Sequence, residues 1–182
     1  MVNLSSFVFY HARLTPERVA LIFGDQRITY AALANRVNAL AAYLHREGIG
    51  ADDVVAVLMK NSCAFIEIAF AVSHVGAVLL PINFRLAAEE VRYIAGNAET
   101  KLVFADAEFE AQTEGLRTVF LDAAAQSDTG VLIKTAPDPV PAAPRKPEDL
   151  FRLMYTSGTT DRPKGVMHSS IGRAWSTWRR CR

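Results

Sequence analysis

Residues 53–59 read "DVVAVLM", an apolar run of strand length. Because the apolar residues are consecutive and do not alternate with polar ones, the run predicts a strand covered on both faces, as parallel strands of α/β proteins are. Similar runs recur downstream. They are "AVLLPI" (77–82), "KLVFAD" (101–106) and "RTVFLD" (117–122). The fold class then depends on what separates these runs.

Helical periodicity separates them. Between Ala31 and Glu47 apolar residues recur on one face of a predicted helix, and Gly48 follows where a C-terminal cap belongs. That face comprises Leu33, Val37, Leu40, Ala41 and Leu44. Further helices are predicted at about 62–75 and 87–98, and a weaker one at about 107–114. This alternation predicts an α/β fold with a mostly parallel sheet flanked by helices.

Ahead of this pattern the chain predicts a short helix and a hairpin. The helix ends before Pro16. A strand at Val19–Phe23, a turn at Gly24–Asp25 and a second strand at "RITY" (27–30) form the hairpin.

The composition changes at Lys134. The stretch "KTAPDPVPAAPRKP" (134–147) holds five of the eight prolines, as is typical of an extended connector. Beyond it, "DLFRLMYTS" (149–157) predicts a short strand. We therefore divide the chain into four segments. They are an α/β part (1–133), a Pro-rich connector (134–149), a strand with a loop (150–170) and an atypical basic tail (171–182).

Charge and composition exclude several classes of function. The 182 residues carry a formal net charge of +1, so no global field favours nucleic acid or an anionic membrane surface. Cys63 and Cys181 make no disulfide framework and indicate a reducing compartment. The apolar stretch 64–82 contains Glu67 and His74, which predicts a buried helix and strand and not a membrane span. We expect a cytoplasmic protein with no signal peptide, transmembrane segment or nucleic-acid partner, and the sequence does not give its oligomeric state.

The loop at 155–166, "YTSGTTDRPKGV", has the chemistry of an anion site. Its hydroxyls are donors, its glycines let backbone N–H groups approach an anion, and Lys164 adds a positive charge. The Walker spacing GxxxxGK[ST] is absent. A Gly-containing loop directly after a strand is a common phosphate site in α/β proteins. An ordinary polar surface loop is the alternative, and the combination of Gly, hydroxyl, Pro and Lys favours phosphate.

The same stretch resembles the phosphate-binding signature of the adenylate-forming (AMP-binding) enzymes, which usually reads Tyr-Thr-Ser-Gly-Thr-Thr-Gly-x-Pro-Lys-Gly-Val. Two upstream stretches also resemble that family's amino-terminal region, namely "ITYAALANRVNALAAYLHREGIGADDVVAVLM" (28–59) and "FIEIAFAVSHVGAVLLPINFRLAAEEVRYI" (65–94). Within the second, "PINFRL" (81–86) is closer to the acyl-CoA synthetase branch than to peptide-synthetase adenylation domains. The resemblance covers roughly residues 4–168.

The resemblance implies a ligase that works in two half-reactions. A carboxylate, from a fatty or other acyl acid, attacks the α-phosphate of Mg²⁺-bound ATP and expels pyrophosphate, and the sulfur of coenzyme A then attacks the acyl-adenylate. ATP and Mg²⁺ are the implied cofactors, coenzyme A is a co-substrate, and the partner is a small carboxylate. No catalytic residue and no metal ligand is implied within this chain. The residues implied to cradle the β- and γ-phosphates are Thr156, Ser157, Gly158, Thr159, Thr160, Lys164 and Gly165.

Asp161 departs from the signature, which has Gly at this position. Asp adopts positive φ with strain, and its carboxylate repels phosphate by roughly 3 kcal/mol at ~5 Å and an effective dielectric of ~20. Arg162 offsets part of this repulsion. We rank weakened ATP binding first, a carboxylate turned outward into solvent second, and a Mg²⁺ ligand third.

The end of the chain also departs from the family. Ser170 stands where the family usually has His, and "IGRAWSTWRRCR" (171–182) does not resemble it. One interpretation is a basic, aromatic patch for nucleic acid, and the favoured one is a frameshift or truncation near residue 170. The adenine and acyl pockets lie downstream in the family. We therefore expect the amino-terminal part of a ligase, with an incomplete sheet and no activity of its own; the alternative is a non-catalytic fragment or small nucleotide-binding module.

Other chemically notable residues predict structural roles. His74 is expected to be a hydrogen-bonded core residue, and Cys63 a small apolar packing residue. Glu89 and Glu90 suit the start of a helix. Tyr155 is expected to be a core aromatic that positions its neighbours. The four histidines share no metal-ligand spacing.

Overall fold

The chain is described in this computed structural model over residues 3–121, 129, 140–156, 163–169 and 174–175. Its helices are α1 (Ser5–Leu14), α2 (Tyr30–Arg46), α3 (Cys63–His74) and α4 (Ala88–Asn97), with a 3₁₀ helix, η1 (Ala107–Gln112). Its strands are β1 (Val19–Phe23), β2 (Gln26–Thr29), β3 (Val54–Leu58), β4 (Val78–Pro81), β5 (Leu102–Asp106), β6 (Thr118–Leu121), β7 (Leu150–Thr156), β8 (Lys164–Ser169) and β9 (Ala174–Trp175).

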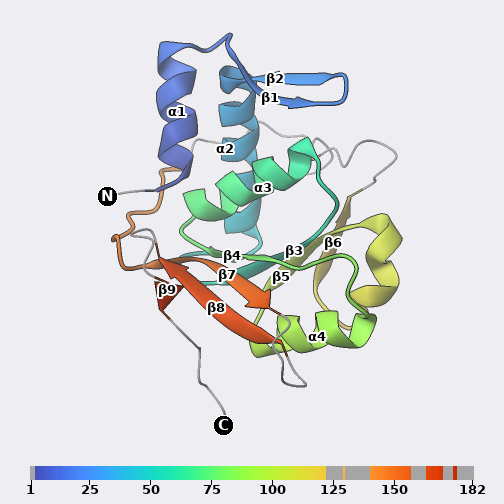
Figure 1. Cartoon of the computed structure of the whole chain (residues 1–182). Helices are drawn as coiled ribbons and strands as arrows, with labels where there is room; N and C mark the ends of the chain where they lie inside the picture. The colour runs from blue at the N-terminus through green and yellow to red at the C-terminus, as the bar shows by residue number, and fades with distance from the viewer. Residues whose placement is uncertain (1–2, 122–128, 130–139, 157–162, 170–173, 176–182) are drawn as a thin grey trace.

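Seven of these strands form one sheet in the order β6-β5-β3-β4-β7-β8-β9 (Figure 1). From β6 to β7 the neighbouring strands are parallel, whereas β8 and β9 are antiparallel additions. The pair β1–β2 is a separate antiparallel hairpin. The predicted fold class, α/β with a mostly parallel sheet flanked by helices, is confirmed.

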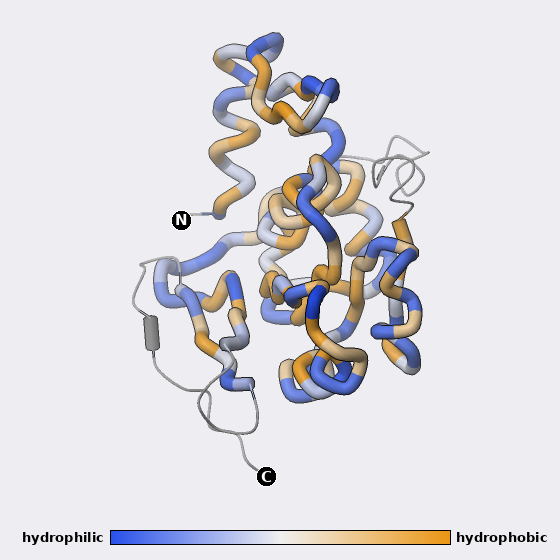
Figure 2. The backbone as a smooth tube through the Cα atoms, turned by 45° about the vertical axis from the view of Figure 1, so that its right-hand side comes forward, coloured by the Kyte–Doolittle hydropathy of each residue, from blue (hydrophilic) through white to orange (hydrophobic). Residues whose placement is uncertain are grey.

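Helices cover both faces of the sheet. Figure 1 shows α1, α2 and α3 on one side and α4 on the other. In β3, Val55 and Val57 join the apolar cluster under α1–α3, while Ala56 and Leu58 join the cluster with α4. All four side chains are at most 1% exposed, which explains why the apolar residues of β3 are consecutive. The tube in Figure 2 shows the same concentration of apolar residues at the centre.

The predicted helix boundaries match local capping chemistry. Thr29 accepts a hydrogen bond from the Ala32 amide (3.2 Å) at the start of α2, and Ser62 accepts one from the Phe65 amide (3.2 Å) at the start of α3. Gly48 has φ +76° just beyond α2, the left-handed conformation expected of a C-terminal cap.

Two segments differ from expectation. The segment predicted as a weaker helix at 107–114 is the 3₁₀ helix η1, interrupted by non-helical φ/ψ at Phe109. Six residues are too short for a stable α-helix, and 3₁₀ geometry is the usual form of such connections. The stretch after Pro163 is a strand, β8, which the sequence pattern did not predict.

The apolar stretch 64–82 forms the buried helix and strand that were predicted, α3 and β4. Glu67 is fully buried in α3. Its carboxylate accepts hydrogen bonds from Arg36 (3.1 Å) and from the Thr129 hydroxyl (2.5 Å). Paired in this way, a buried carboxylate is tolerated. Among the described residues, every helix is too short or too polar to cross a bilayer.

His74 joins three distant segments. Its Nδ1 lies 2.9 Å from the Ser5 hydroxyl, and its Nε2 lies 2.7 Å from the carbonyl oxygen of Val140. Asn3 strengthens the junction by donating to the carbonyls of Ser73 (2.7 Å) and Ala143 (3.3 Å). His74 is 3% exposed, which confirms the expectation of a hydrogen-bonded core histidine.

Burial lowers the pKa of His74 below its ordinary value of 6.5, and His45 lowers it slightly further, against a smaller opposite effect of the Val140 carbonyl. The unfolded chain therefore binds a proton at His74 more readily than the folded one. We expect the free energy of unfolding to fall as pH drops from about 7 to 5, by up to ~1.4 kcal/mol per pH unit from this group. The slope of the free energy of unfolding against pH, measured by urea denaturation at each pH, should be smaller in His74→Gln than in the wild type.

Gly76 packs against the same junction. It has φ +77°, and a Cβ built there would lie 2.9 Å from Cβ of Ala143. Gly76→Ala should therefore lower the free energy of unfolding by about 2–4 kcal/mol, measured by urea denaturation. Gly96→Ala is the matched control, because Gly96 lies within α4 with open space around it; this change should stabilise the fold by about 0.5–1 kcal/mol.

Candidate functional site

The predicted phosphate loop connects β7 to β8. The two strands pair antiparallel along their length, and Thr156 lies directly opposite Lys164 at the loop end of the hairpin. Phosphate loops of the Walker and dinucleotide-binding types lead from a strand into a helix, so this loop has no following helix N-terminus to stabilise an anion. Binding of an anion must therefore rest on the loop itself and on Lys164.

The loop end lies at the carboxyl edge of the parallel sheet. β7 runs parallel to β4, with Leu79 opposite Arg152. Its last residue, Thr156, therefore points to the edge at which β3, β4 and β5 also end. Ligands of open α/β sheets bind at this edge. The segment after β4, residues 82–87, follows at the same edge, where Gln112 Nε2 donates to the carbonyls of Phe84 (3.1 Å) and Leu86 (2.8 Å).

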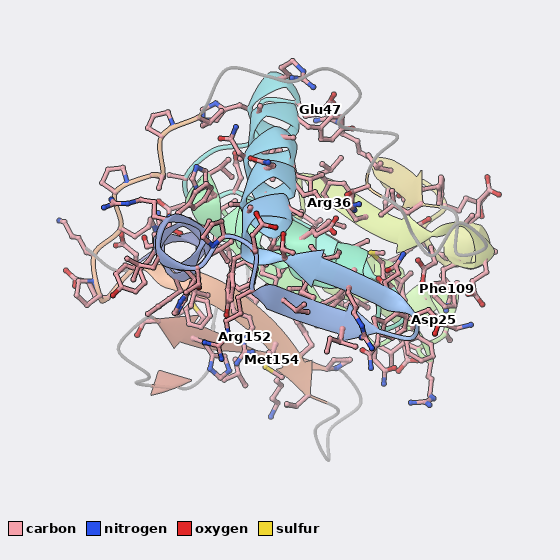
Figure 3. All side chains as sticks on the ribbon, turned by 90° about the horizontal axis from the view of Figure 1, so that it is seen from above. Asp25, Arg36, Glu47, Phe109, Arg152 and Met154 are labelled. Carbon is pink, nitrogen blue, oxygen red and sulfur yellow. The ribbon has the colours of Figure 1, made fainter. Side chains whose placement is uncertain are left out.

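Cross-strand pairs place the hairpin residues on two faces. Thr156, Lys164, Arg152 and His168 occupy opposed positions on one face, because directly opposite residues share a face and alternate residues repeat it. Thr156 and Lys164 are both exposed. Figure 3 shows Arg152 on this pair of strands, well away from Asp25 at the turn of the β1–β2 hairpin. This face, called the Thr156–Lys164 face below, carries the positive charges of Lys164 and Arg152 and also His168.

Of the seven residues implied to bind phosphate, the structure describes three. Thr156 and Lys164 lie opposite each other on the Thr156–Lys164 face, and Gly165 lies on the opposite face of the hairpin. Ser157, Gly158, Thr159 and Thr160 lie outside the described residues, as does Asp161.

Packing against Tyr155 explains why position 165 is occupied by glycine. Gly165 lies opposite Tyr155, and a Cβ built at Gly165 would be 3.1 Å from Cζ of the Tyr155 ring. The Tyr155 hydroxyl donates to Oδ1 of Asn97 at 2.6 Å. Burial raises the pKa of Tyr155 to about 12, with a smaller contribution from Tyr93, so the hydroxyl remains a donor at physiological pH. The half-buried ring of Tyr155 thus lies between β8 and the end of α4.

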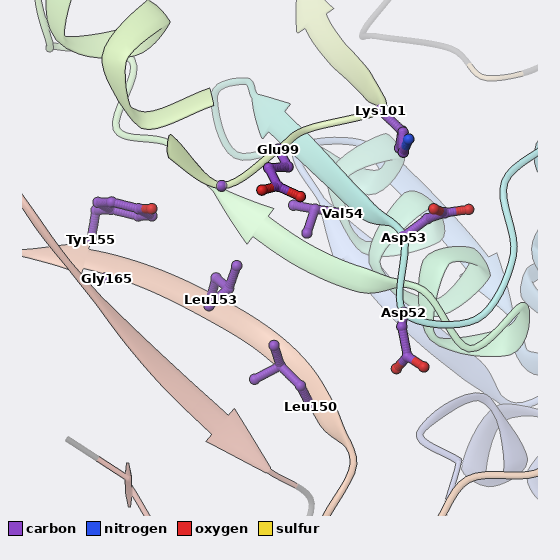
Figure 4. Close-up of a pocket in the computed structure, with 10 residues that line it drawn as sticks. Asp52, Asp53, Val54, Glu99, Lys101, Leu150, Leu153, Tyr155 and Gly165 are labelled. Atoms are coloured by element: carbon purple, nitrogen blue, oxygen red, sulfur yellow. The ribbon is translucent and has the colours of Figure 1, made fainter. Parts of the chain in front are cut away.

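A cavity of about 200 Å³ lies on the Tyr155 side of the hairpin (Figure 4). Leu150, Leu153 and Tyr155 of β7 line one wall, and residues 52–54, 98–99 and 101 line the other. Arg145 fixes β7 at this end, because its guanidinium donates to Asp52 (2.7 Å) and to the carbonyl of Leu150 (2.9 Å). The cavity faces away from Thr156 and Lys164, so we do not assign it to phosphate.

Sequence reasoning missed Asn97 and the residues after β4. Asn97 belongs to no sequence motif. Its hydrogen bond with Tyr155 is seen only in the folded structure, where the end of α4 lies beside β7. The segment 82–87 had a usable signal, since it directly follows a predicted strand. Within the described part of the chain, no group of three His, Cys, Asp or Glu residues could hold a metal ion.

The packing of Gly165 gives a testable prediction. In Gly165→Ala the new methyl group meets a ring that Asn97 holds from the other side, so we expect a loss of about 1–3 kcal/mol in the free energy of unfolding. In a Tyr155→Ala background the same change should cost nothing, because the ring is absent. Urea denaturation of the two single variants and the double variant measures the coupling, and additive losses would contradict the packing account.

Comparison with known proteins identifies the family. Residues 8–180 match the AMP-binding enzymes, a match that also includes most of the 171–182 tail. The chain is 32% identical to the indoleacetate–CoA ligase of Aromatoleum aromaticum, covering 96% of this chain and 36% of that enzyme. It is 34% identical to tyrocidine synthase 2 of Brevibacillus parabrevis, covering 86% of this chain and 4% of the synthase.

A solved structure agrees with these relatives. The N-terminal domain of FACL13 from Mycobacterium tuberculosis is 31% identical and superposes with a TM-score of 0.82, over 93% of this chain and 45% of that one. The chain thus spans about a third of the length of the indoleacetate–CoA ligase and a small part of the synthase. With its parallel sheet, its Lys-bearing hairpin and these relatives, the chain belongs to the AMP-binding enzyme family.

Proposed function

We propose that the β7–β8 hairpin binds the β- and γ-phosphates of ATP, as part of a ligase that activates a carboxylic acid to an acyl-adenylate and then to an acyl-CoA. The opposition of Thr156 and Lys164 at the carboxyl edge of the sheet carries this proposal. Arg152 adds a further positive charge to the same face, four residues along β7 from Thr156. Ser157, Gly158, Thr159, Thr160 and Gly165 complete the proposed phosphate site.

Phosphate binding requires only that these side chains be correctly placed and that Lys164 carry its charge. Lys164 neutralises phosphate charge, Thr156 donates a hydrogen bond, and neither transfers a proton. Mg²⁺ and coenzyme A belong to the proposal through the family, and Mg²⁺ would neutralise further phosphate charge when bound. The described residues provide no cluster for the metal, so we assign it no ligand in this chain.

The carboxylate is proposed only as a class. Relatives named for indoleacetate, 4-hydroxybutyrate, ferulate and 2-succinylbenzoate favour an acid–thiol ligase and do not select a fatty acid. Tyrocidine synthase 2 is also a relative, so the assignment to the acyl-CoA synthetase branch is part of this proposal. The division of the chain into segments 1–133, 134–149, 150–170 and 171–182 is also part of this proposal. We further propose that these 182 residues bind nucleotide without completing the reaction.

Calorimetric titration of the chain with Mg²⁺-ATP tests the phosphate site. Lys164→Ala should weaken binding by about tenfold or more, the size of one charge-assisted hydrogen bond. Asp161→Gly should tighten binding, by at least about threefold, because it removes a carboxylate that repels phosphate. Lys146→Ala, which removes an exposed lysine of the connector, is the control and should leave binding unchanged.

Equal affinity of the wild type and Lys164→Ala would refute the site. Carboxylate-dependent exchange of pyrophosphate into ATP distinguishes the two functional classes. We expect binding without exchange for this chain, and exchange would show that it completes adenylation alone.

A further inference from the structure

The loop end of the hairpin extends beyond the support of the sheet. β7 pairs with β4 at Leu79–Arg152, and Thr156 lies four residues further along β7. β4 ends at Pro81, which has no amide hydrogen to continue the ladder. On the other side, within the part of the chain that the structure describes, β8 pairs with the two-residue strand β9 at Met167 and His168. Backbone pairing with the parallel sheet therefore does not hold Thr156 and Lys164 in place.

One side-chain contact does reach this end of the hairpin. Tyr155 is adjacent to Thr156, and its hydroxyl donates to Oδ1 of Asn97 at 2.6 Å. Its ring lies against Gly165, which is adjacent to Lys164. Figure 4 shows Tyr155 and Gly165 side by side on the adjacent strands β7 and β8. A single ring thus contacts both strands one residue before the proposed phosphate site.

The other end of this contact is rigid. Asn97 is the last residue of α4, whose Val91 and Ile94 are at most 2% exposed in the cluster beneath the sheet. The helix is closed behind it by the amides of Glu99 and Thr100, which donate to the carbonyls of Gly96 (3.1 Å) and Ala95 (3.0 Å). The backbone that carries the exposed side chain of Asn97 is therefore held in place.

We propose that Tyr155 and Asn97 are positioning residues, whose hydrogen bond fixes the loop end of the hairpin relative to the sheet and so presents Thr156 and Lys164 to the phosphates. The presentation of Thr156 and Lys164 to phosphates rests on the proposed function. The claim that the hydrogen bond fixes the hairpin does not depend on it. Tyr155 acts through its neighbours, because its own side chain lies on the opposite face from Thr156 and Lys164.

Amide hydrogen exchange of the full chain without nucleotide tests the hold. Tyr155→Phe removes the hydroxyl and keeps the ring on Gly165, and Asn97→Ala removes the acceptor. Either change should raise exchange at residues 154–156 and 164–166 by about three- to tenfold, the worth of one hydrogen bond, and leave β3 unchanged. The double variant should match the single ones. Asn97→Asp keeps an acceptor oxygen and should restore protection.

Tyr43→Phe is the matched control. Tyr43 is a half-buried tyrosine on α2 in contact with Phe104, and its change should not alter exchange in the hairpin. Unchanged hairpin exchange in Tyr155→Phe or Asn97→Ala would overturn the inference. An equal rise in β3 and the hairpin would also overturn it, because that pattern reports a general loss of stability.

Titration with Mg²⁺-ATP separates this inference from the proposed function. Tyr155→Phe and Asn97→Ala should each weaken binding about threefold or more, and Tyr43→Phe should not. If the wild type binds and both variants bind equally well, the positioning role is refuted while the proposed function stands. If the wild type does not bind, the proposed function fails for this chain, and with it the presentation to phosphates; the exchange data still decide whether the hydrogen bond holds the hairpin.

Discussion

Burial of the central strand on both faces is the constraint that organises this protein. β3 sends Val55 and Val57 into one apolar cluster and Ala56 and Leu58 into the other, so helices must pack above and below it. Parallel strands require crossover connections, and those connections supply the helices. The carboxyl ends of β3, β4, β5 and β7 consequently meet at one edge, and that edge receives the hairpin.

The same constraint explains why most of the fold was predictable. Strands buried on both faces and helices with one apolar face leave strong periodic signals, and Thr29, Ser62 and Gly48 mark helix ends by known chemistry. The weaker helix predicted at about 107–114 is the 3₁₀ helix η1, since a short run such as "AEFEAQ" suits either helical geometry. β8 was missed because "KGVMHS" has no clean alternation, and only its pairing with β7 makes it a strand.

The candidate site was predictable in composition and not in arrangement. The hydroxyls, glycines and Lys164 are visible in the letters, and so is their resemblance to a known family. The sequence does not show that Thr156 and Lys164 lie opposite each other while Gly165 faces Tyr155, since both facts follow from the register of the hairpin. Asn97 shows this most clearly. It lies 58 residues from Tyr155 along the chain, and the contact exists only through tertiary packing.

The junction of Asn3, Ser5, His74 and Val140 also bears on how the chain acquires its structure during synthesis. Asn3 contacts the carbonyl of Ala143, 140 positions further along the chain, so the segment that carries Asn3 is made well before the partner that it contacts. At the usual ~5–20 residues per second, this delay is on the order of ten seconds. The inner face of α1 packs against α2 and α3, which are made soon after it, so the delay concerns the contacts of Asn3 and His74 with residues 140–143. This junction therefore closes late in synthesis, after the helices that it fastens to the Pro-rich segment have already formed their own contacts.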